Sequence, residues 1–283
     1  MGWRLRIDHT TRVTYAGPVL TSFNEARMTP LTLPTQVTLE SRVTAGPGVP
    51  VWTYSDYWGT IASVFDLPDP HDELAVRAVA TVETEAFPGL AASAARPAWA
   101  DISDKAKGGR LLEFLLPTPL TTVAEEITSA AKAEISGLSP DAAAEAISTR
   151  VRERVTYMPG ATGVRTNAQE AWDQGQGVCQ DMAQLTVALL RCVGLPARYV
   201  SGYLHPHSQA EPGSTAVGQS HAWVEYWAGS WTPLDPTSGA AVGERHVVVA
   251  RGRDYTDVPP LKGIYHGPAA GNLQVTVEVT RLA

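Results

Sequence analysis

The chain of 283 residues has only two cysteines and no long apolar run. Cys179 and Cys192 fall in a stretch that is predicted to form one helix, whose rise of about 20 Å between them is far more than a disulfide can span. Both thiols are therefore predicted to be free, as is typical of a reducing compartment. No apolar stretch approaches the roughly 20 residues of a membrane-spanning helix, and the first residues alternate polar with apolar side chains, unlike a signal peptide. A soluble, cytoplasmic protein without a membrane partner is expected.

Clustered positive charge is also missing. Lys and Arg total 22 against 29 Asp and Glu, which gives a formal net charge of −7. Because phosphate backbones bind clustered Lys and Arg, nucleic acid is not expected as a partner. No loop is acidic enough to suggest a calcium site, and the pair His205 and His207 has no further Cys or Asp nearby to complete a metal site. No metal or cofactor is therefore expected.

Residues 1–119 predict an antiparallel β-sandwich followed by a connector. Polar and apolar residues alternate in three runs that are separated by Gly- and Pro-containing turns, around Leu5–Tyr15, Gln36–Arg42 and Leu74–Glu83. Short alternating strands at this spacing favour a sandwich. The Ala-, Pro- and Gly-rich residues 87–119 predict a connector with little regular structure.

Residues 120–283 predict an α+β domain. Two helices come first, the second of which opens at Ser139-Pro140. A long apolar helix over Gly177–Val193 follows and ends at Gly194-Leu195-Pro196. Four strand-like runs come after it: Ala197–Leu204, His221–Trp227, Trp231–Pro236 and Asn272–Thr280. A helix followed by antiparallel strands is an α+β pattern.

Cys179 is the candidate nucleophile. It lies in the first turn of the long helix, where unpaired N–H groups and the helix dipole favour an anion such as a thiolate. A nucleophilic cysteine also needs a base within hydrogen-bond reach. The alternative is a small buried hydrophobic residue, which suits Cys192 near the other end of the helix.

His221 and Asp235 are the candidate base and its partner. They lie on adjacent strand-like runs that are joined by a short turn at Ala228-Gly229. A three-residue loop places the two side chains on one face of the sheet, whereas a two-residue loop places them on opposite faces. An Asp beside an imidazole holds its tautomer and stabilises the imidazolium. With Cys179, the three residues predict a Cys-His-Asp site.

These residues lie in longer motifs. Residues 177–203, which include Gly-Val-Cys-Gln-Asp and Gly-Leu-Pro, together with Ser220-His221-Ala222-Trp223 and Asp235-Pro236-Thr237, resemble the core of bacterial transglutaminase-like proteins. The N-terminal sandwich is similar to the β region that precedes that core. The resemblance implies a papain-like α+β core in which Cys179 attacks a carbonyl, His221 shuttles the proton and Asp235 orients His221. It also implies that the Cys179 N–H and Tyr157 form an oxyanion site.

The immediate neighbours of the nucleophile affect the expected reaction. Calcium-dependent animal transglutaminases carry Gln before the nucleophile and Trp after it, whereas this chain has Val178 and Gln180. Hydrolysis of a peptide or side-chain amide is therefore the expected reaction, with a peptide or protein amide as substrate. Amine transfer and a non-catalytic binding module on the same fold are the alternatives. Trp172 and Trp223 are predicted to border the substrate groove, the alternative being core packing.

Overall fold

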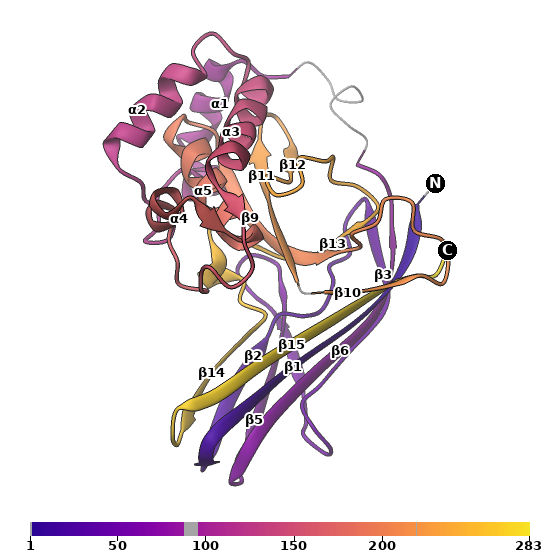
Figure 1. The fold of residues 1–283 in the computed structure, drawn as a ribbon. Helices are drawn as coiled ribbons and strands as arrows, with labels where there is room; N and C mark the ends of the chain where they lie inside the picture. The colour runs from indigo at the N-terminus through magenta and orange to yellow at the C-terminus, as the bar shows by residue number, and fades with distance from the viewer. Residues whose placement is uncertain (1, 88–95, 219) are drawn as a thin grey trace.

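Both ends of the chain build the sandwich, as a computed structural model covering residues 2–87, 96–218 and 220–283 shows. One sheet has the order β10-β15-β1-β6-β3 and the other the order β14-β2-β5-β4. Figure 1 shows β1, β6 and β15 as long neighbouring strands below the helices. The strands of the first sheet are β1 (Trp3–Val19), β3 (Gln36–Thr44), β6 (His71–Thr84), β10 (Thr215–Gly218) and β15 (Ala270–Arg281). Those of the second are β2 (Thr21–Ala26), β4 (Trp52–Ser55), β5 (Ile61–Leu67) and β14 (Leu261–His266).

The predicted boundary between two domains at residues 119 and 120 places the C-terminal strands in the second domain, but these strands belong to the sandwich. β15 pairs antiparallel with β1 from Leu5 opposite Arg281 to Tyr15 opposite Ala270, and β14 pairs with β2. Alternation along β15 indicates a strand with one buried face, but it does not show which sheet the strand joins. The chain between β6 and β14, apart from β10, carries the predicted Cys-His-Asp site and is called the catalytic part below. It is therefore inserted between the strands of the sandwich, not appended to it.

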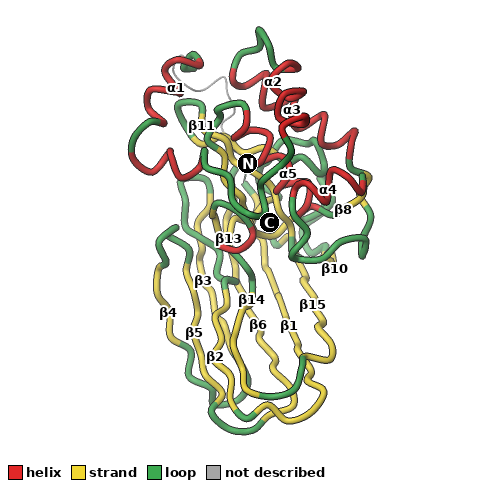
Figure 2. The backbone as a smooth tube through the Cα atoms, turned by 90° about the vertical axis from the view of Figure 1, so that its left-hand side faces the viewer, coloured by secondary structure: helices red, strands yellow, loops and turns green. Residues whose placement is uncertain are grey.

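The catalytic part centres on an antiparallel sheet of order β12-β11-β9-β13, with α5 packed on one face. Its strands are β9 (Ala197–Leu204), β11 (His221–Trp227), β12 (Trp231–Leu234) and β13 (His246–Gly252). The α-helices are α1 (Trp99–Ala106), α2 (Glu125–Glu134), α3 (Pro140–Arg154), α4 (Ala168–Gln174) and α5 (Cys179–Cys192). α2, α3 and α4 contact α5, so this helix is buried along most of its length. The predicted α+β class is confirmed (Figure 2).

One expectation about local structure was wrong, and one strand of the central sheet was missed. The connector over residues 87–119 contains α1 and the 3-10 helix η2 (Gly109–Phe114), while residues 88–95 lie outside the described part of the chain. β13 was not predicted as a strand, because its run of consecutive buried residues has no alternation. Within the described residues, no helix combines the length and apolar character needed to cross a membrane.

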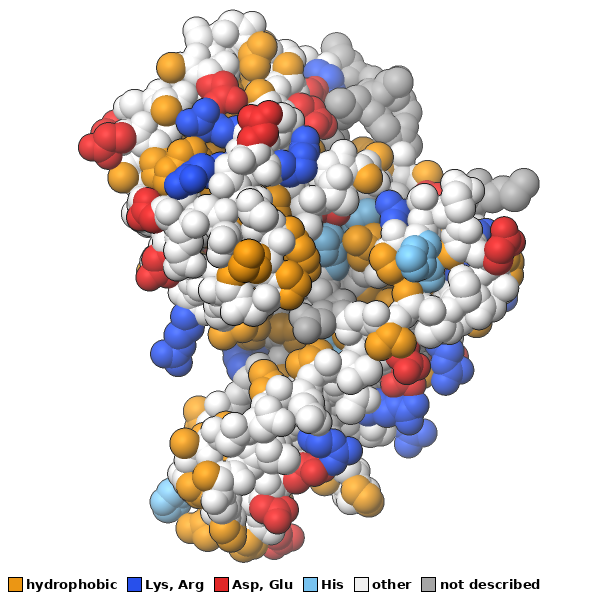
Figure 3. Space-filling model, viewed as in Figure 1, with side chains coloured by type: hydrophobic (Ala, Val, Ile, Leu, Met, Phe, Trp, Pro, Cys, Tyr) orange, Lys and Arg blue, Asp and Glu red, His pale blue; other side chains and the backbone are white. Residues whose placement is uncertain are grey.

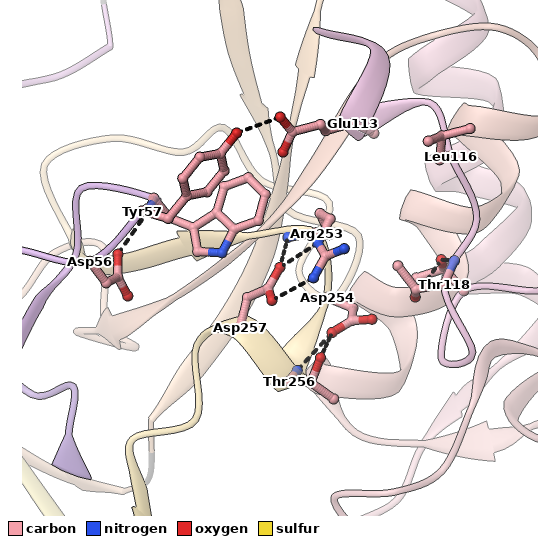
Figure 4. A network of polar contacts seen from close by, with 12 residues as sticks. Asp56, Tyr57, Glu113, Leu116, Thr118, Arg253, Asp254, Thr256 and Asp257 are labelled. Atoms are coloured by element: carbon pink, nitrogen blue, oxygen red, sulfur yellow. Dashed lines mark hydrogen bonds and ion pairs between the residues drawn. The ribbon is translucent and has the colours of Figure 1, made fainter. Parts of the chain in front are cut away.

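Aromatic and ionic contacts join the sandwich to the catalytic part (Figure 4). The Tyr57 hydroxyl, in the turn between β4 and β5, donates to Glu113 of η2 at 2.5 Å. Trp58 packs on Phe114 with ring centroids 5.5 Å apart. The Arg253 guanidinium lies 5.4 Å from the centre of the Trp58 ring and is paired with an acid of η3 (Tyr255–Asp257). These contacts fix the sandwich against the part that carries the predicted site.

Candidate active site

The N-terminus of α5 presents Cys179. The Asp181 carboxylate accepts the Val178 N–H at 2.7 Å and the Thr162 hydroxyl at 2.5 Å, which caps the helix and holds the preceding loop. Gly177 leaves room for this cap, because a Cβ there would lie 2.9 Å from the Asp181 side chain. Asp181 is thus used for capping, as its first-turn position indicates.

The loop between β11 and β12 has the three-residue length that the sequence argument required. Trp227 pairs with Trp231, and Val224 with Leu234. His221 and Asp235 consequently lie on one face, and the His221 Nε2 is 3.0 Å from an Asp235 carboxylate oxygen. The structure therefore brings the predicted base and its partner together.

His221 is poised as a cation. Burial by itself would lower its pKa, but hydrogen bonds to Asp235 and to Cys179, together with the negative charge of both, raise the pKa of His221 to about 9. Because Nε2 of His221 shares a hydrogen bond with Asp235, Nδ1 is the ring nitrogen available to Cys179. This arrangement favours the imidazolium form of His221 at neutral pH, next to the Cys179 side chain.

Asp235 is fully buried and is held as a carboxylate. Burial opposes this, but hydrogen bonds from His221, His246 and Ser238 lower its pKa well below the usual range. The Ser238 hydroxyl donates at 2.7 Å and the Thr237 N–H at 2.9 Å. These donors fix the carboxylate that orients His221.

His246 is a functional residue that the sequence argument missed. Its Nε2 lies 3.5 Å from the Asp235 carboxylate, and its Nδ1 accepts the Gly243 N–H at 3.3 Å. Burial lowers the pKa of His246, so the neutral ring donates its Nε2 proton to Asp235. The sequence signal that could have revealed His246 is a histidine at the start of an apolar run. Because that run was not predicted to be a strand, it could not be placed beside the site.

Among the described residues, His221, Asp235 and His246 also form a group whose ligand atoms lie within 4.8 Å of one another. A metal ion would bind to a lone pair on a ring nitrogen. The Nε2 atoms of His221 and His246 instead share hydrogen bonds with the Asp235 carboxylate. Because Nδ1 of His246 accepts a hydrogen bond from a backbone N–H, the proton of the neutral ring is on Nε2. The donor set therefore fits a hydrogen-bonded positioning network better than a metal centre.

Tyr157 lies close to the nucleophile. Strand β7 (Thr156–Tyr157) pairs with β8 (Gln176–Gly177), which immediately precedes α5. Burial and then the negative charge of Cys179 raise the pKa of Tyr157. The phenol therefore stays protonated at neutral pH and is able to donate, and its oxyanion role remains a prediction.

Trp172 and Trp223 do not line the cavity at Cys179, so their expected place in the groove was wrong. Trp223 is fully buried, and its ring stacks on His221 with centroids 6.0 Å apart. The guanidinium groups of Arg150 and Arg154 lie 5.2 and 5.3 Å from the centre of the Trp172 ring. Trp223 is two residues after His221 and so lies on the same face of the sheet, but it is buried there and does not reach the cavity.

The cavity at Cys179 has a volume of about 590 Å³ and opens between the catalytic part and the sandwich. Figure 3 shows this hollow, with histidine and hydrophobic side chains visible inside it. The described lining residues include Cys179, His221, Tyr199 and Thr162 from the catalytic part. The sandwich contributes residues of β1, β2, β6, β14 and β15 to the wall. The loop of residues 205–218 does not contribute to this wall.

Comparisons with known proteins agree with this architecture. Family models match the chain for the Transglutaminase-like superfamily over residues 121–236 and for the Bacterial transglutaminase-like N-terminal region over residues 5–83. An uncharacterized protein of Mycobacterium leprae is 43% identical over 281 residues, or 99% of this chain and 100% of the relative. A protein-glutamine gamma-glutamyltransferase of Pseudomonas aeruginosa is 36% identical over 86 residues, or 29% of this chain and 13% of that enzyme. A crystal structure of "a Putative Cysteine Protease from Cytophaga hutchinsonii" has a TM-score of 0.76 at 21% identity, covering 100% of this chain and 92% of that one.

The chain belongs to the transglutaminase-like superfamily. The resemblance predicted from the motifs is confirmed. At the level of the family, the chain is a thiol-dependent enzyme of the acyl-transfer type.

Replacing Asp235 by Asn is expected to move the alkaline limb of the pH–rate profile to lower pH. Asp235 raises the pKa of His221 through its hydrogen bond and its charge, so a neutral amide weakens the imidazolium. We expect the limb to fall from about pH 9 in the parent by about one unit or more. The kcat/KM profile of each protein measures this, and an unmoved limb in a folded variant would show that Asp235 does not control His221.

Proposed function

We propose that the protein is a cysteine hydrolase that cleaves a peptide or side-chain amide through a thioester on Cys179. The observation that carries the proposal is the His221 ring, held between Asp235 and Cys179 with its pKa raised to about 9. The nucleophile and the base lie at one cavity that is large enough for a peptide segment. Each part of the arrangement supports attack on a carbonyl carbon.

In the first half-reaction the Cys179 sulfur bonds to the carbonyl carbon, and the carbon–nitrogen bond then breaks. His221 gives its proton to the leaving amine, which departs neutral. We propose that the Cys179 N–H and the Tyr157 hydroxyl donate to the oxyanion while it exists.

In the second half-reaction His221 takes a proton from water while the water oxygen attacks the thioester carbon. The carbon–sulfur bond breaks, the carboxylic acid leaves, and the thiolate beside the imidazolium is restored. Asp235 stays ionised throughout and stabilises the imidazolium.

The charge of the cavity supports water over an amine as the second nucleophile. Among the described residues that line it, none is Asp or Glu. A lysine side chain arriving as an ammonium ion would meet no acid to bind it, but it would meet the positive charge of Lys262. Water carries no such penalty.

Amine transfer is the second candidate, because the matching Pseudomonas aeruginosa protein is named a glutamyltransferase. Peptide amides incubated in H₂¹⁸O with a fluorescent primary amine separate the two reactions by mass spectrometry. Hydrolysis gives ¹⁸O-labelled carboxylates, whereas predominant amine adducts would contradict the proposal. The Cys179→Ala variant is the matched control.

If neither product forms although Cys179 reacts with small electrophiles, the non-catalytic binding module becomes the better account.

Cytoplasmic location, expected from the two free cysteines, belongs to the proposal, as do a peptide or protein substrate and the absence of nucleic-acid and membrane partners.

A further inference from the structure

The sandwich has an open strand edge beside the active site. β10 covers β15 only where Thr215–Gly218 lie opposite residues 277–280. Among the described residues, no strand pairs with this side of β15 from Ala270 to Thr276. β10 ends at Gly218, and the chain enters β11 at His221. The open edge therefore continues the line of β10 past the point where the chain turns toward the catalytic histidine.

The hydrogen bonds at the end of β15 show which main-chain groups face this edge. The Leu282 N–H donates to the Arg4 carbonyl at 2.7 Å, on the β1 side. The Arg281 N–H donates to the Ser214 carbonyl at 3.0 Å, on the β10 side. In an antiparallel pair these directions alternate along the strand, and the pairing with β1 is regular from residue 272 to residue 281. Odd-numbered residues of β15 therefore direct their N–H and C=O groups away from β1.

Among the described residues, none pairs with the outward main-chain groups of Leu273 and Val275. The side chains of both residues line the cavity that holds Cys179. Leu273 is 60% exposed, which is unusual for an apolar residue facing the interior of a sandwich. Natural proteins protect open apolar strand edges with charges, prolines or bulges. From residue 272 to residue 276, β15 has no charge and no proline, and its pairing with β1 shows no bulge there.

Most side chains on the sandwich side of the cavity are apolar or aromatic, and the polar ones are His9, Thr11, Asn24 and Lys262. Val13 and Leu74 from one sheet face Leu261 and Tyr265 from the other. Lys262 is the charged residue among the described sandwich positions of the wall, and it is paired with Glu25 at 2.9 Å. A charged side chain entering this space would lose its hydration without gaining a partner.

We propose that the substrate is an extended peptide segment that adds as a strand to the open edge of β15, in line with β10, and places uncharged apolar side chains between the two sheets. Its main chain pairs with Leu273 and Val275, as in other cases of strand addition. The sandwich is then the specificity module of the enzyme. This inference rests on the proposed function, because it assumes that Cys179 reacts with the bound segment.

The inference is tested by comparing how fast Cys179 reacts with three electrophiles. One is iodoacetamide, and the others are N-acetyl tetrapeptide chloromethyl ketones, one of leucine and alanine and one of glutamate and alanine. We expect the parent to react with the apolar peptide at least about tenfold faster than with the acidic one, after both rates are divided by the iodoacetamide rate. Equal rates would overturn the inference. If iodoacetamide does not label Cys179, the proposed function fails, and the inference fails with it.

Two sets of variants identify the edge. Leu273→Asp should remove most of the preference for the apolar peptide. Ile264→Asp, at a position that is also exposed (73% against 60%) but lies outside the cavity wall, should keep it. Val275→Pro removes the outward N–H, and Val275→Ala controls for the lost side chain. Proline is tolerated at such edge positions, so the apolar peptide should react about three- to tenfold more slowly with the proline variant than with the alanine variant. Unchanged selectivity in Leu273→Asp, or equal rates for the proline and alanine variants, would contradict strand addition.

Discussion

Cys179→Ala is expected to abolish turnover, with a loss of at least about 10⁴-fold in kcat, as for other nucleophiles that act as a unit with their base. In the proposed reaction the sulfur of Cys179 forms the thioester, and no other described cysteine lines the cavity. The rate of hydrolysis of a peptide amide, monitored through the amine that is released, measures the effect.

Cys192→Ala is the matched control for this variant. Its thiol accepts the Thr128 hydroxyl at 3.4 Å at the far end of α5, away from the cavity. Activity should therefore persist when Cys192 is replaced. Residual turnover above about 1% in Cys179→Ala would mean that another group performs the chemistry.

Gly202→Ala is expected to lower the free energy of unfolding by about 3 kcal/mol or more. A Cβ at this position would lie 2.0 Å from the Val247 carbonyl oxygen and 2.7 Å from the Trp223 ring. The first atom belongs to the neighbouring strand and the second to a fully buried side chain, so neither can move cheaply. Because Gly202 lies opposite His221 in the sheet, the same change should displace His221.

Gly218→Ala is the matched control in the open strand β10. It has ordinary φ and no atom within 4 Å of an added Cβ, so its stability should change by less than about 0.5 kcal/mol. Urea unfolding of both variants measures the difference. Similar midpoints for Gly202→Ala and the parent would show that β9 and β13 do not pack as described.

The candidate site was largely predictable because its residues lie in local patterns. Cys179 begins a long helix with a clear end, and the position of His221 relative to Asp235 depends on one loop length. The periodicity of apolar residues predicts whether a segment is a helix or a strand, and the pairing of two strands predicts which side chains share a face of the sheet. The network behind Asp235 was harder to predict, because His246 comes from β13, whose buried run carries no alternation.

The sandwich could be predicted only in part. Its longest strands alternate clearly, but β2, β4 and β14 are short, and their partners are distant in the sequence. Most importantly, β15 returns to the N-terminal sheet across almost the whole chain. Such long-range pairing leaves no local signal, so the cavity between the sandwich and Cys179 could not be foreseen.

The central claim is that Cys179 and His221 form one ionised pair. The most direct test is the rate of Cys179 alkylation by iodoacetamide between pH 5 and pH 10, measured by mass spectrometry in the parent and in His221→Ala. Because the pKa of His221 is raised to about 9, its cation persists at neutral pH and stabilises the thiolate. The account predicts rapid labelling of Cys179 at pH 6 in the parent and a shift of the rate profile to higher pH in His221→Ala. Identical profiles in the two proteins would contradict it.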